Sequence, residues 1–411
     1  MAQIGILHYA GPPVVGGVEI TMAAHARWLA AMGHSVRVIA GSGGEGGMGV
    51  ETWLRPEFSS RGGLIELVNA ELARGVRSAA YAALVDRIAG ELADALAGLD
   101  VLMVHNVLTL QKNLALTAAL HRLAAAGQAP RLLAWCHDFA WLDPLYTPEL
   151  HAGEPWDLLR RPWPHTRYVV VSQDRRGMLA GLLGLPEDEI TVVTPGVDLD
   201  ALLKLEPETS ALVRRLDLLH ADPLLLLPAR ITRRKNIEAA VAITGALRAQ
   251  GLAPRLVVTG PPGPHNPSNA AYLAQLQALR DATGDPASVV FLYESFCDAA
   301  GAPLPVSDAM LADFYRLADA LLLPSRYEGF GIPVIEAGLV GMPIFASDIP
   351  PFHETAGDAA LLFDLELPAH QVAERIAQAM RGDARLALRR RVRLAYTWEA
   401  IIRRDIEPLL A

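Results

Sequence analysis

Two glutamates flank a glycine-rich stretch in the last third of this 411-residue chain. Glu328 and Glu336 are separated by seven residues, and the run Gly329-Phe330-Gly331-Ile332-Pro333 lies between them. The apolar segment 320–323 predicts a buried strand before the loop, and Pro333 is typical of the first turn of a helix. Free N–H groups and the positive end of a helix dipole collect at such a place, which suits an anionic ligand. An ordinary strand, loop and helix with solvated glutamates is the alternative.

A cationic pair occurs earlier in the chain. Arg230 and Lys235 lie five residues apart in a loop that follows a strand predicted over 224–227. Two cations at this spacing can stabilise negative charge on a bound phosphate. Arginine makes forked contacts to phosphate oxygens, and lysine contributes a point charge. Surface ion pairing is the alternative for both residues, and a solvated position is expected for Arg233 and Arg234 between them.

The elements that must position these groups alternate between strands and helices. A Rossmann-like opening is predicted by a strand over 4–9, a glycine-rich loop over 11–19, a helix to Met32 and a strand over 35–40. It is not the dinucleotide fingerprint, because that loop lacks the Gly-x-Gly-x-x-Gly pattern. Gly16 and Gly17 in that loop would allow close approach of the backbone to a ligand, but a simple turn is an equal alternative. Residues 64–96 carry one long helical pattern.

A histidine stands at the end of a further predicted strand. His137 follows the apolar segment 132–136, and a lone histidine in such a place can be structural or functional. The proline and glycine of the run 194–198 stop the first alternation, so a domain boundary is expected near residue 200. A second alternation of strands and helices begins at Leu224 and continues to a strand over 361–364.

Composition excludes several classes of protein. A net charge of −9 argues against general binding to nucleic acid or to anionic lipid, and two cysteines provide neither a disulfide framework nor a cysteine metal site. The N-terminal sequence has no signal-peptide pattern, and no apolar run approaches the ~18 residues that span a bilayer. We therefore expect a cytoplasmic protein with no transmembrane segment.

The spacing of Glu328 and Glu336, the glycine run and the preceding Pro324-Ser325 resemble the signature of the retaining, nucleotide-sugar-dependent glycosyltransferases of family 4. The resemblance implies an α/β fold of two Rossmann-like domains facing across a cleft, the glycosyltransferase-B arrangement. Residues 1–199 would form the acceptor-side domain and residues 200–385 the donor-side domain. Residues 386–411 would form a C-terminal helix that crosses back to the first domain.

The resemblance also implies roles for the residues of the donor-side domain. Arg230 and Lys235 would grip the leaving diphosphate, Glu328 would contact the donor sugar, and Glu336 would bind the ribose hydroxyls. The loop between the glutamates would contribute the rest of the donor site, with backbone N–H groups meeting phosphate or sugar: Gly329, Phe330, Gly331 and Ile332.

Three residues of the first domain complete the implied site. Gly16 and Gly17 resemble the family's N-terminal loop, which approaches the donor diphosphate and the acceptor, and His137 matches a histidine that faces the donor sugar. The catalytic group would thus comprise His137, Arg230, Lys235 and Glu328.

The implied reaction moves a sugar from a UDP-, GDP- or ADP-sugar to a hydroxyl of a carbohydrate, lipid-linked or small-molecule acceptor, with retention of the anomeric configuration. We expect no cofactor and no metal, because Arg230 and Lys235 can supply the positive charge that the diphosphate needs. Two alternatives stay open, a nucleotide-sugar epimerase on the same fold and a non-catalytic subunit that binds sugar nucleotides.

Overall fold

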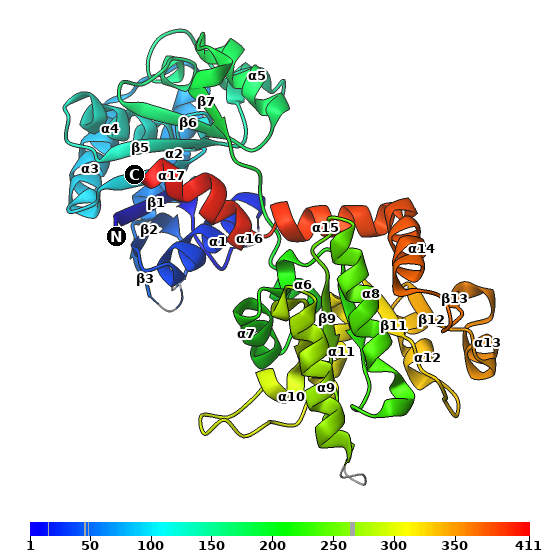
Figure 1. Cartoon of the computed structure of the whole chain (residues 1–411). Helices are drawn as coiled ribbons and strands as arrows, with labels where there is room; N and C mark the ends of the chain where they lie inside the picture. The colour runs from blue at the N-terminus through cyan, green and yellow to red at the C-terminus, as the bar shows by residue number, and fades with distance from the viewer. Residues whose placement is uncertain (15, 45–46, 48, 264–267) are drawn as a thin grey trace. The chain divides into compact units, whose positions relative to one another are not determined.

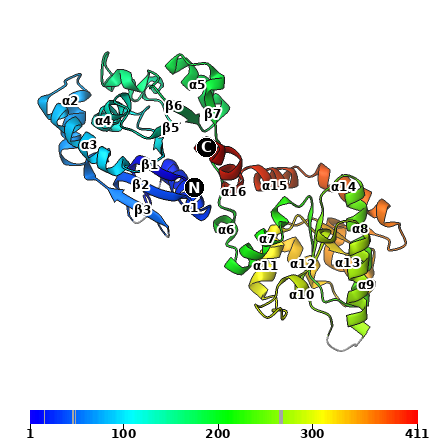
Figure 2. The same ribbon diagram turned by 60° about the vertical axis from the view of Figure 1, so that its left-hand side comes forward.

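The computed structural model describes residues 1–14, 16–44, 47, 49–263 and 268–411. These residues form two compact units (Figures 1 and 2), and each is described by itself. Unit 1 comprises Met1–Val197 and Tyr396–Ala411, and unit 2 comprises Asp198–Ala395. The chain therefore passes from one unit to the other twice.

The sheet of unit 1 is entirely parallel, with the strand order β3-β2-β1-β4-β5-β6-β7. From β1 the successive strands β2 and β3 are added on one side, and from β4 the successive strands β5 to β7 are added on the other side. The direction in which strands are added therefore reverses between β1 and β4, as in a Rossmann sheet. The strands are β1 (Gln3–Ala10), β2 (Ser35–Ser42), β3 (Val50–Leu54), β4 (Val101–His105), β5 (Arg131–Cys136), β6 (Thr166–Val170) and β7 (Ile190–Val192).

Helices cover both faces of this sheet because successive strand side chains point to opposite sides. Leu102 and Val104 pack with four helices on one face, and Met103 packs on the other face with α1 and the C-terminal segment. The first group is α2 (Gly63–Leu72), α3 (Ala79–Leu96), α4 (Leu114–Ala125) and α5 (Gln173–Leu183). The second is α1 (Gly17–Ala31), α16 (Trp398–Ile401) and α17 (Glu407–Leu410).

The sheet of unit 2 repeats this topology with six parallel strands in the order β10-β9-β8-β11-β12-β13. The reversal of chain order falls between β8 and β11, where Leu226 pairs with Leu321. The strands are β8 (Leu224–Leu227), β9 (Arg255–Val258), β10 (Val289–Phe291), β11 (Ala320–Leu323), β12 (Ile344–Ser347) and β13 (Leu361–Phe363).

Two apolar cores lie on the two faces of this second sheet. Leu225 and Leu227 pack with α8 (Ile237–Ala249), α9 (Ser268–Ala282) and α14 (Ala369–Gly382), whereas Leu224 and Leu226 pack with helices on the opposite face. Those helices are α7 (Pro207–Arg215), α11 (Asp308–Leu317), α12 (Ile332–Leu339) and α13 (Pro350–Ala356). The remaining helices of unit 2 are α6 (Leu199–Leu203), α10 (Leu292–Ser295) and α15 (Ala384–Ala395).

The predicted α/β class with two Rossmann-like domains is confirmed, and two local predictions are corrected. The single helical pattern over 64–96 forms two helices, because Gly75 adopts a left-handed φ of 79° and Ser78 caps the N-terminus of α3. Strand β3 was not predicted. None of the helices formed by described residues is long and apolar enough to cross a bilayer. The facing of the two domains across a cleft stays a prediction.

Candidate active site

The two loops that carry the predicted donor-site residues lie side by side in unit 2. They follow β8 and β11, the neighbouring strands at which chain order reverses. The carboxyl ends of parallel strands at such a point are where ligands bind in open α/β sheets. A backbone hydrogen bond from Arg326 N to Arg234 O, 2.8 Å long, ties the loops together. The topology therefore brings the cationic loop and the glutamate loop to one place.

Glu328 is the centre of this arrangement. Its side chain is 8% exposed, and its Oε1 accepts hydrogen bonds from Lys235 Nζ at 2.5 Å and from Ser325 Oγ at 2.7 Å. Arg234 Nη1 donates to Oε2 at 3.0 Å. Burial alone would raise the pKa of Glu328, but the hydrogen bonds from Lys235 and Ser325 and the two positive charges lower it below its ordinary value. Glu328 is thus held as a carboxylate.

Lys235 is as buried as its partner, with a side chain 10% exposed. The prediction placed it on a diphosphate, and the structure places its ammonium against Glu328, a contact that the sequence analysis did not anticipate. Arg234, expected to be solvated, is half-exposed and bonded to Glu328. Arg234 is thus exposed, as expected, but it also has a partner that was not predicted, because the Glu328 loop lies beside the loop of Arg234.

Arg230 is placed differently from Lys235. Its side chain is exposed at the start of the same loop. No hydrogen bond or ion pair holds that side chain within the described ranges of the chain. An exposed guanidinium at the carboxyl end of β8 keeps its donors available for a phosphate.

The loop after Glu328 turns sharply into helix α12. Gly331 caps this helix with a left-handed φ of 95°, and a Cβ there would lie 2.8 Å from the ring of Phe352. Glycine is therefore required by both conformation and space. Ile332 starts the helix, while Gly329 and Phe330 are exposed beside its N-terminus. Pro333 has no N–H and Val334 N donates to Gly331 O, so the N–H of Ile332 and those of the preceding loop are the ones left for an anion, and anion binding here stays a prediction.

Glu336 lies one turn into α12. Its Oε2 accepts a hydrogen bond of 2.5 Å from the Tyr315 hydroxyl, which comes from helix α11. Burial and the adjacent Glu336 carboxylate raise the pKa of Tyr315, so its hydroxyl stays a donor. Tyr315 fixes one carboxylate oxygen of Glu336, and this positioning residue was missed by sequence reasoning because no local signal joins it to the glycine loop.

The predicted residues of unit 1 follow the carboxyl ends of two strands, β1 for Gly16 and Gly17 and β5 for His137. Gly16 adopts an extended conformation before α1, and Gly17 begins the helix, where an added Cβ would meet no described atom within 4 Å. His137 follows β5, and its Nε2 lies 3.0 Å from Nδ1 of the buried His105. Burial and the neighbouring His8 lower the pKa of His137 to about 4, so it is neutral at pH 7. Whether these residues meet those of unit 2 stays a prediction.

The sequence carries one Asp-x-Asp pattern, at Asp198 and Asp200, of the kind that can hold a divalent ion against phosphates. Both carboxylates have structural partners. Asp198 accepts from Ala201 N at the start of α6, and Asp200 pairs with Arg214 at 2.7 Å. Within the described part of the chain, no three histidine, cysteine, aspartate or glutamate side chains are grouped as metal ligands.

Two parallel sheets of Rossmann-like topology, with a cationic loop and a helix N-terminus where the chain order of the second sheet reverses, define a two-domain α/β protein of the doubly wound class. Two family models match the chain, "Glycosyltransferase Family 4" over residues 15–201 and "Glycosyl transferases group 1" over residues 211–395. The chain belongs to glycosyltransferase family 4.

Two similar proteins are named D-inositol 3-phosphate glycosyltransferase. The protein from Xylanimonas cellulosilytica is 33% identical over 44% of this chain and 40% of its own length. The protein from Thermomonospora curvata is 30% identical over 59% of this chain and 56% of its own length. The chain therefore matches less than two thirds of each relative. Sucrose-phosphate synthase from Thermosynechococcus elongatus, a solved structure, aligns over 100% of this chain and 98% of its own at 20% identity, with a TM-score of 0.38 that carries no argument.

Proposed function

We propose that this chain is a retaining glycosyltransferase that moves a sugar from a nucleoside diphosphate sugar to an acceptor hydroxyl without a divalent metal. Membership of family 4 supports transfer over the two alternatives, an epimerase and a non-catalytic subunit. The donor would be a UDP-, GDP- or ADP-sugar. The acceptor would be a carbohydrate, a lipid-linked molecule or another small molecule.

The observation that carries this proposal is the buried contact between Lys235 and Glu328, which lies at the carboxyl ends of β8 and β11 in the sheet of unit 2. A buried ion pair costs desolvation free energy and is a weak device for stability alone. Its position, next to the exposed Arg230 and the N-terminus of α12, is the place where this fold binds ligands. The pair thus fits a site that handles both the phosphate and the sugar of a donor.

Each predicted residue has a role in the proposed reaction. Arg230 and Lys235 would stabilise the leaving diphosphate, and the N–H groups of Phe330 and Gly331 would meet phosphate or sugar oxygens. Glu328 would hold the donor sugar beside Gly329 and Ile332, with its charge facing the anomeric centre.

The remaining roles concern the ribose and the first domain. Glu336, oriented by Tyr315, would accept hydrogen bonds from the ribose hydroxyls. Gly16, Gly17 and His137 would face the donor from unit 1. A cytoplasmic location is part of this proposal and is supported by two free cysteines, Cys136 and Cys297.

The proposed step breaks one bond and forms one. The bond between the anomeric carbon and the phosphate oxygen breaks, and its electron pair leaves with the diphosphate. The acceptor oxygen bonds the anomeric carbon from the same face, and its proton passes to a phosphate oxygen of the leaving group. Lys235 and Arg230 would stabilise the charge that develops on that leaving group, which is where electrostatic catalysis is strongest.

A thermal-shift screen of UDP, GDP, ADP and their glucose and mannose conjugates tests the proposal. A ligand that binds only the folded state raises the melting temperature by mass action. We expect one nucleotide family to raise it, and we expect the Lys235→Ala variant to lose most of that shift. No shift with any of these nucleotides would contradict the proposal.

A further inference from the structure

The imidazole ring of His137 is held by the strand beside its own. Strand β4 ends at His105, and it pairs with β5 through His105 and Trp135. Nε2 of His137 lies 3.0 Å from Nδ1 of His105, and the two rings are stacked at an interplanar angle of 25°. Nδ1 of His137 has no hydrogen-bond partner among the described residues and is not one of the fully buried nitrogens. His137 therefore has one nitrogen turned to the protein and one that a ligand can reach.

The backbone of His137 is held from the same strand end. Asn106 follows β4 with a left-handed φ of 60° and is buried. Its Oδ1 accepts a hydrogen bond from the N–H of His137 at 2.8 Å and another from the N–H of Asp138 at 3.2 Å. Two consecutive residues thus fix both the ring and the backbone of His137, so the fold sets the direction of this ring.

His105 itself is fully buried, and within the described ranges its ring makes one hydrogen bond, to His137. The ring packs against Trp135, with 5.7 Å between the ring centroids, and against His25 at 5.5 Å. Its Nε2 has no partner in the part of the chain that the structure describes. Burying a polar ring costs free energy that an apolar side chain would not cost. What a histidine adds at this position, compared with an apolar residue, is the contact with His137.

Both rings are neutral at pH 7. Burial and three neighbouring histidines, His137 among them, lower the pKa of His105 well below its ordinary value. Burial and the neighbouring His8 lower the pKa of His137 to about 4. A neutral imidazole has one N–H and one bare nitrogen, so one ring donates in this contact and the other accepts. The tautomer of His105 therefore decides the tautomer of His137.

Two arrangements of the protons satisfy the contact. If Nδ1 of His105 accepts, the proton of that ring lies on Nε2, as a buried N–H without an acceptor. If Nδ1 of His105 donates, Nε2 is a bare acceptor and no buried N–H is left without a partner in this ring. In protein interiors, N–H groups without an acceptor are rarer than acceptors that lack donors. The second arrangement is therefore favoured, and in it Nε2 of His137 accepts while Nδ1 of His137 carries the proton.

We propose that His105 is a positioning residue that fixes the tautomer of His137, so that His137 donates a hydrogen bond from Nδ1 to an uncharged oxygen of the donor sugar. A neutral donor suits this place, because the anomeric carbon becomes electron-poor as its bond to phosphate breaks and a positive charge nearby would oppose that change. The contact with the sugar rests on the proposed function, whereas the tautomer does not.

NMR on the full chain with nitrogen-labelled histidine tests the tautomer without any ligand. Correlations between the ring nitrogens and the carbon-bound ring protons distinguish the two tautomers, and the loss of a signal in His137→Ala assigns it. His8 is the internal standard: its Nδ1 lies 2.8 Å from the backbone oxygen of His105, which only accepts, so Nδ1 of His8 carries the proton. We expect His137 to show the same pattern as His8. A His137 ring with its proton on Nε2 would overturn the proposal.

Two variants of His105 separate this role from packing. Leucine and asparagine have similar shapes, but only asparagine can donate a hydrogen bond near the position of Nδ1. In His105→Leu, part of the His137 population should carry its proton on Nε2. Its kcat/KM should fall about tenfold, the effect of losing one hydrogen bond, for the nucleotide sugar selected among the UDP, GDP and ADP conjugates. His105→Asn should keep the tautomer and recover most of that loss. His121→Leu, at a half-buried histidine packed against Trp163, is the matched control and should behave like the wild type.

A positioning residue acts through its partner, so His105→Leu should have no further effect on kcat/KM in the His137→Ala background. An equal loss with and without His137 would overturn the positioning role, as would wild-type tautomer and transfer in His105→Leu. If His105→Leu does not fold, the tautomer of the wild type still decides the proposal.

Calorimetry with UDP, GDP and ADP separates this proposal from the proposed function. These nucleotides lack the sugar, so the one that binds should have the wild-type Kd in both His105 variants. A failure of the proposed function would appear as absent nucleotide binding and absent transfer, with the proton of His137 on Nδ1 as expected.

Discussion

Lys235 Nζ lies 2.5 Å from Glu328 Oε1, and the two side chains, 93 residues apart in the sequence, are both buried. Each charge is compensated by the other, and Ser325 and Arg234 satisfy further positions on the carboxylate. The two residues therefore act as one unit: a change at either position leaves a buried charge with less compensation. The donor diphosphate, if it binds here, would compete with Glu328 for the same ammonium group.

The stability of this pair can be measured by a double-mutant cycle. Lys235→Met and Glu328→Gln should each lower the free energy of unfolding, by about 3 kcal/mol where the remaining charge stays buried. The double variant should lose less than the sum of the two single variants, since neither charge remains. Arg234→Ala, at the half-exposed partner, should cost under about 1 kcal/mol. Chemical unfolding followed by fluorescence measures all four, and additive losses would show that the contact has no coupling energy.

Arg230 should matter for turnover and not for stability. Arg230→Ala removes an exposed guanidinium, so the melting temperature should change little, but kcat should fall by roughly 10²–10³ if the residue stabilises the leaving diphosphate. Arg233→Ala is the matched control in the same loop, because that side chain lies over the ring of Tyr272 at 4.8 Å. Steady-state kinetics with a saturating acceptor measures kcat for both variants. Equal kcat values for Arg230→Ala and Arg233→Ala would exclude the proposed role of Arg230.

The local features of this fold were predictable because they have local causes. The four-leucine segment before Arg230 forms β8, and the glycine run after Glu328 opens α12, since apolar runs and glycine or proline punctuation act over a few residues. Gly75 is the counterexample: its left-handed conformation divides a helical pattern whose apolar periodicity continues across it.

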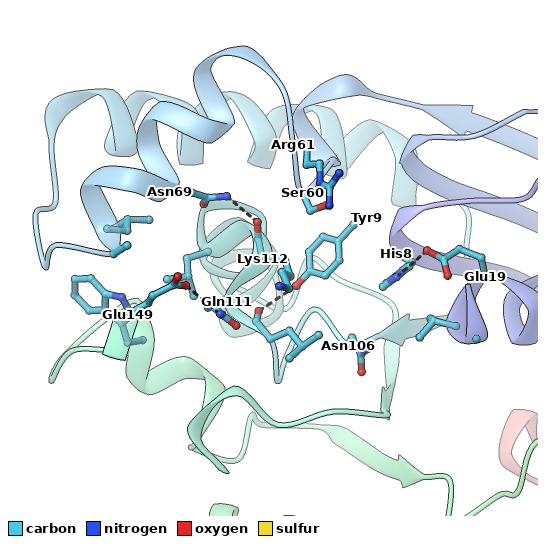
Figure 3. A pocket seen from close by; sticks show the side chains of 17 residues that line it. His8, Tyr9, Glu19, Ser60, Arg61, Asn69, Asn106, Gln111, Lys112 and Glu149 are labelled. Carbon is cyan, nitrogen blue, oxygen red and sulfur yellow. Dashed lines mark hydrogen bonds and ion pairs between the residues drawn. The ribbon is translucent and has the colours of Figure 1, made fainter. Parts of the chain in front are cut away.

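The contact between Lys235 and Glu328 could not be predicted in the same way. It depends on β8 and β11 being neighbours, although β9 and β10 lie between them in the chain. The same is true of Gln111 and His8, which line one cavity of unit 1 (Figure 3) only because β1 lies beside β4. Sequence patterns identify the residue types at strand ends, but the order of strands decides which of those ends share a site.

The burial of His25 predicts that the folded protein loses stability in mild acid. Burial and the neighbouring His137 lower the pKa of His25 to about 3, and both of its ring nitrogens lack partners among the described residues. The unfolded chain binds a proton at this ring below about pH 6.5, whereas the folded chain does not until far lower pH. The free energy of unfolding should therefore fall as pH drops from about 6.5 toward 4.

His25→Phe isolates this effect, because it keeps a ring between Trp135 and Trp398 and removes the titration. Its melting temperature should decline less steeply between pH 6.5 and 4 than that of the wild type. The exposed His370→Phe should follow the wild-type curve. Parallel curves for all three proteins would rule out His25 as a source of the acid sensitivity.

Sugar transfer should persist when divalent metals are removed. Asp198 caps helix α6, and Asp200 forms an ion pair with Arg214. The positive charge that the diphosphate needs would come from Arg230 and Lys235. Initial rates measured in EDTA should match those measured with magnesium within about twofold, because the side chains of Arg230 and Lys235 would supply the electrostatic stabilisation. Activity abolished by EDTA and restored by magnesium or manganese would contradict this view.

The most direct measurement of the central claim compares Glu328→Gln with Glu336→Gln, in sugar transfer and in nucleotide binding. Glu336 would hold the ribose similarly in ground and transition states, so its change should mainly raise the donor KM. Glu328 would act on the reacting sugar, so Glu328→Gln should bind the nucleoside diphosphate by calorimetry at least as tightly as the wild type, since Lys235 is released, yet lower kcat by roughly 10²–10³. If Glu328→Gln both binds and transfers sugar like the wild type, the buried pair is not part of the catalytic site.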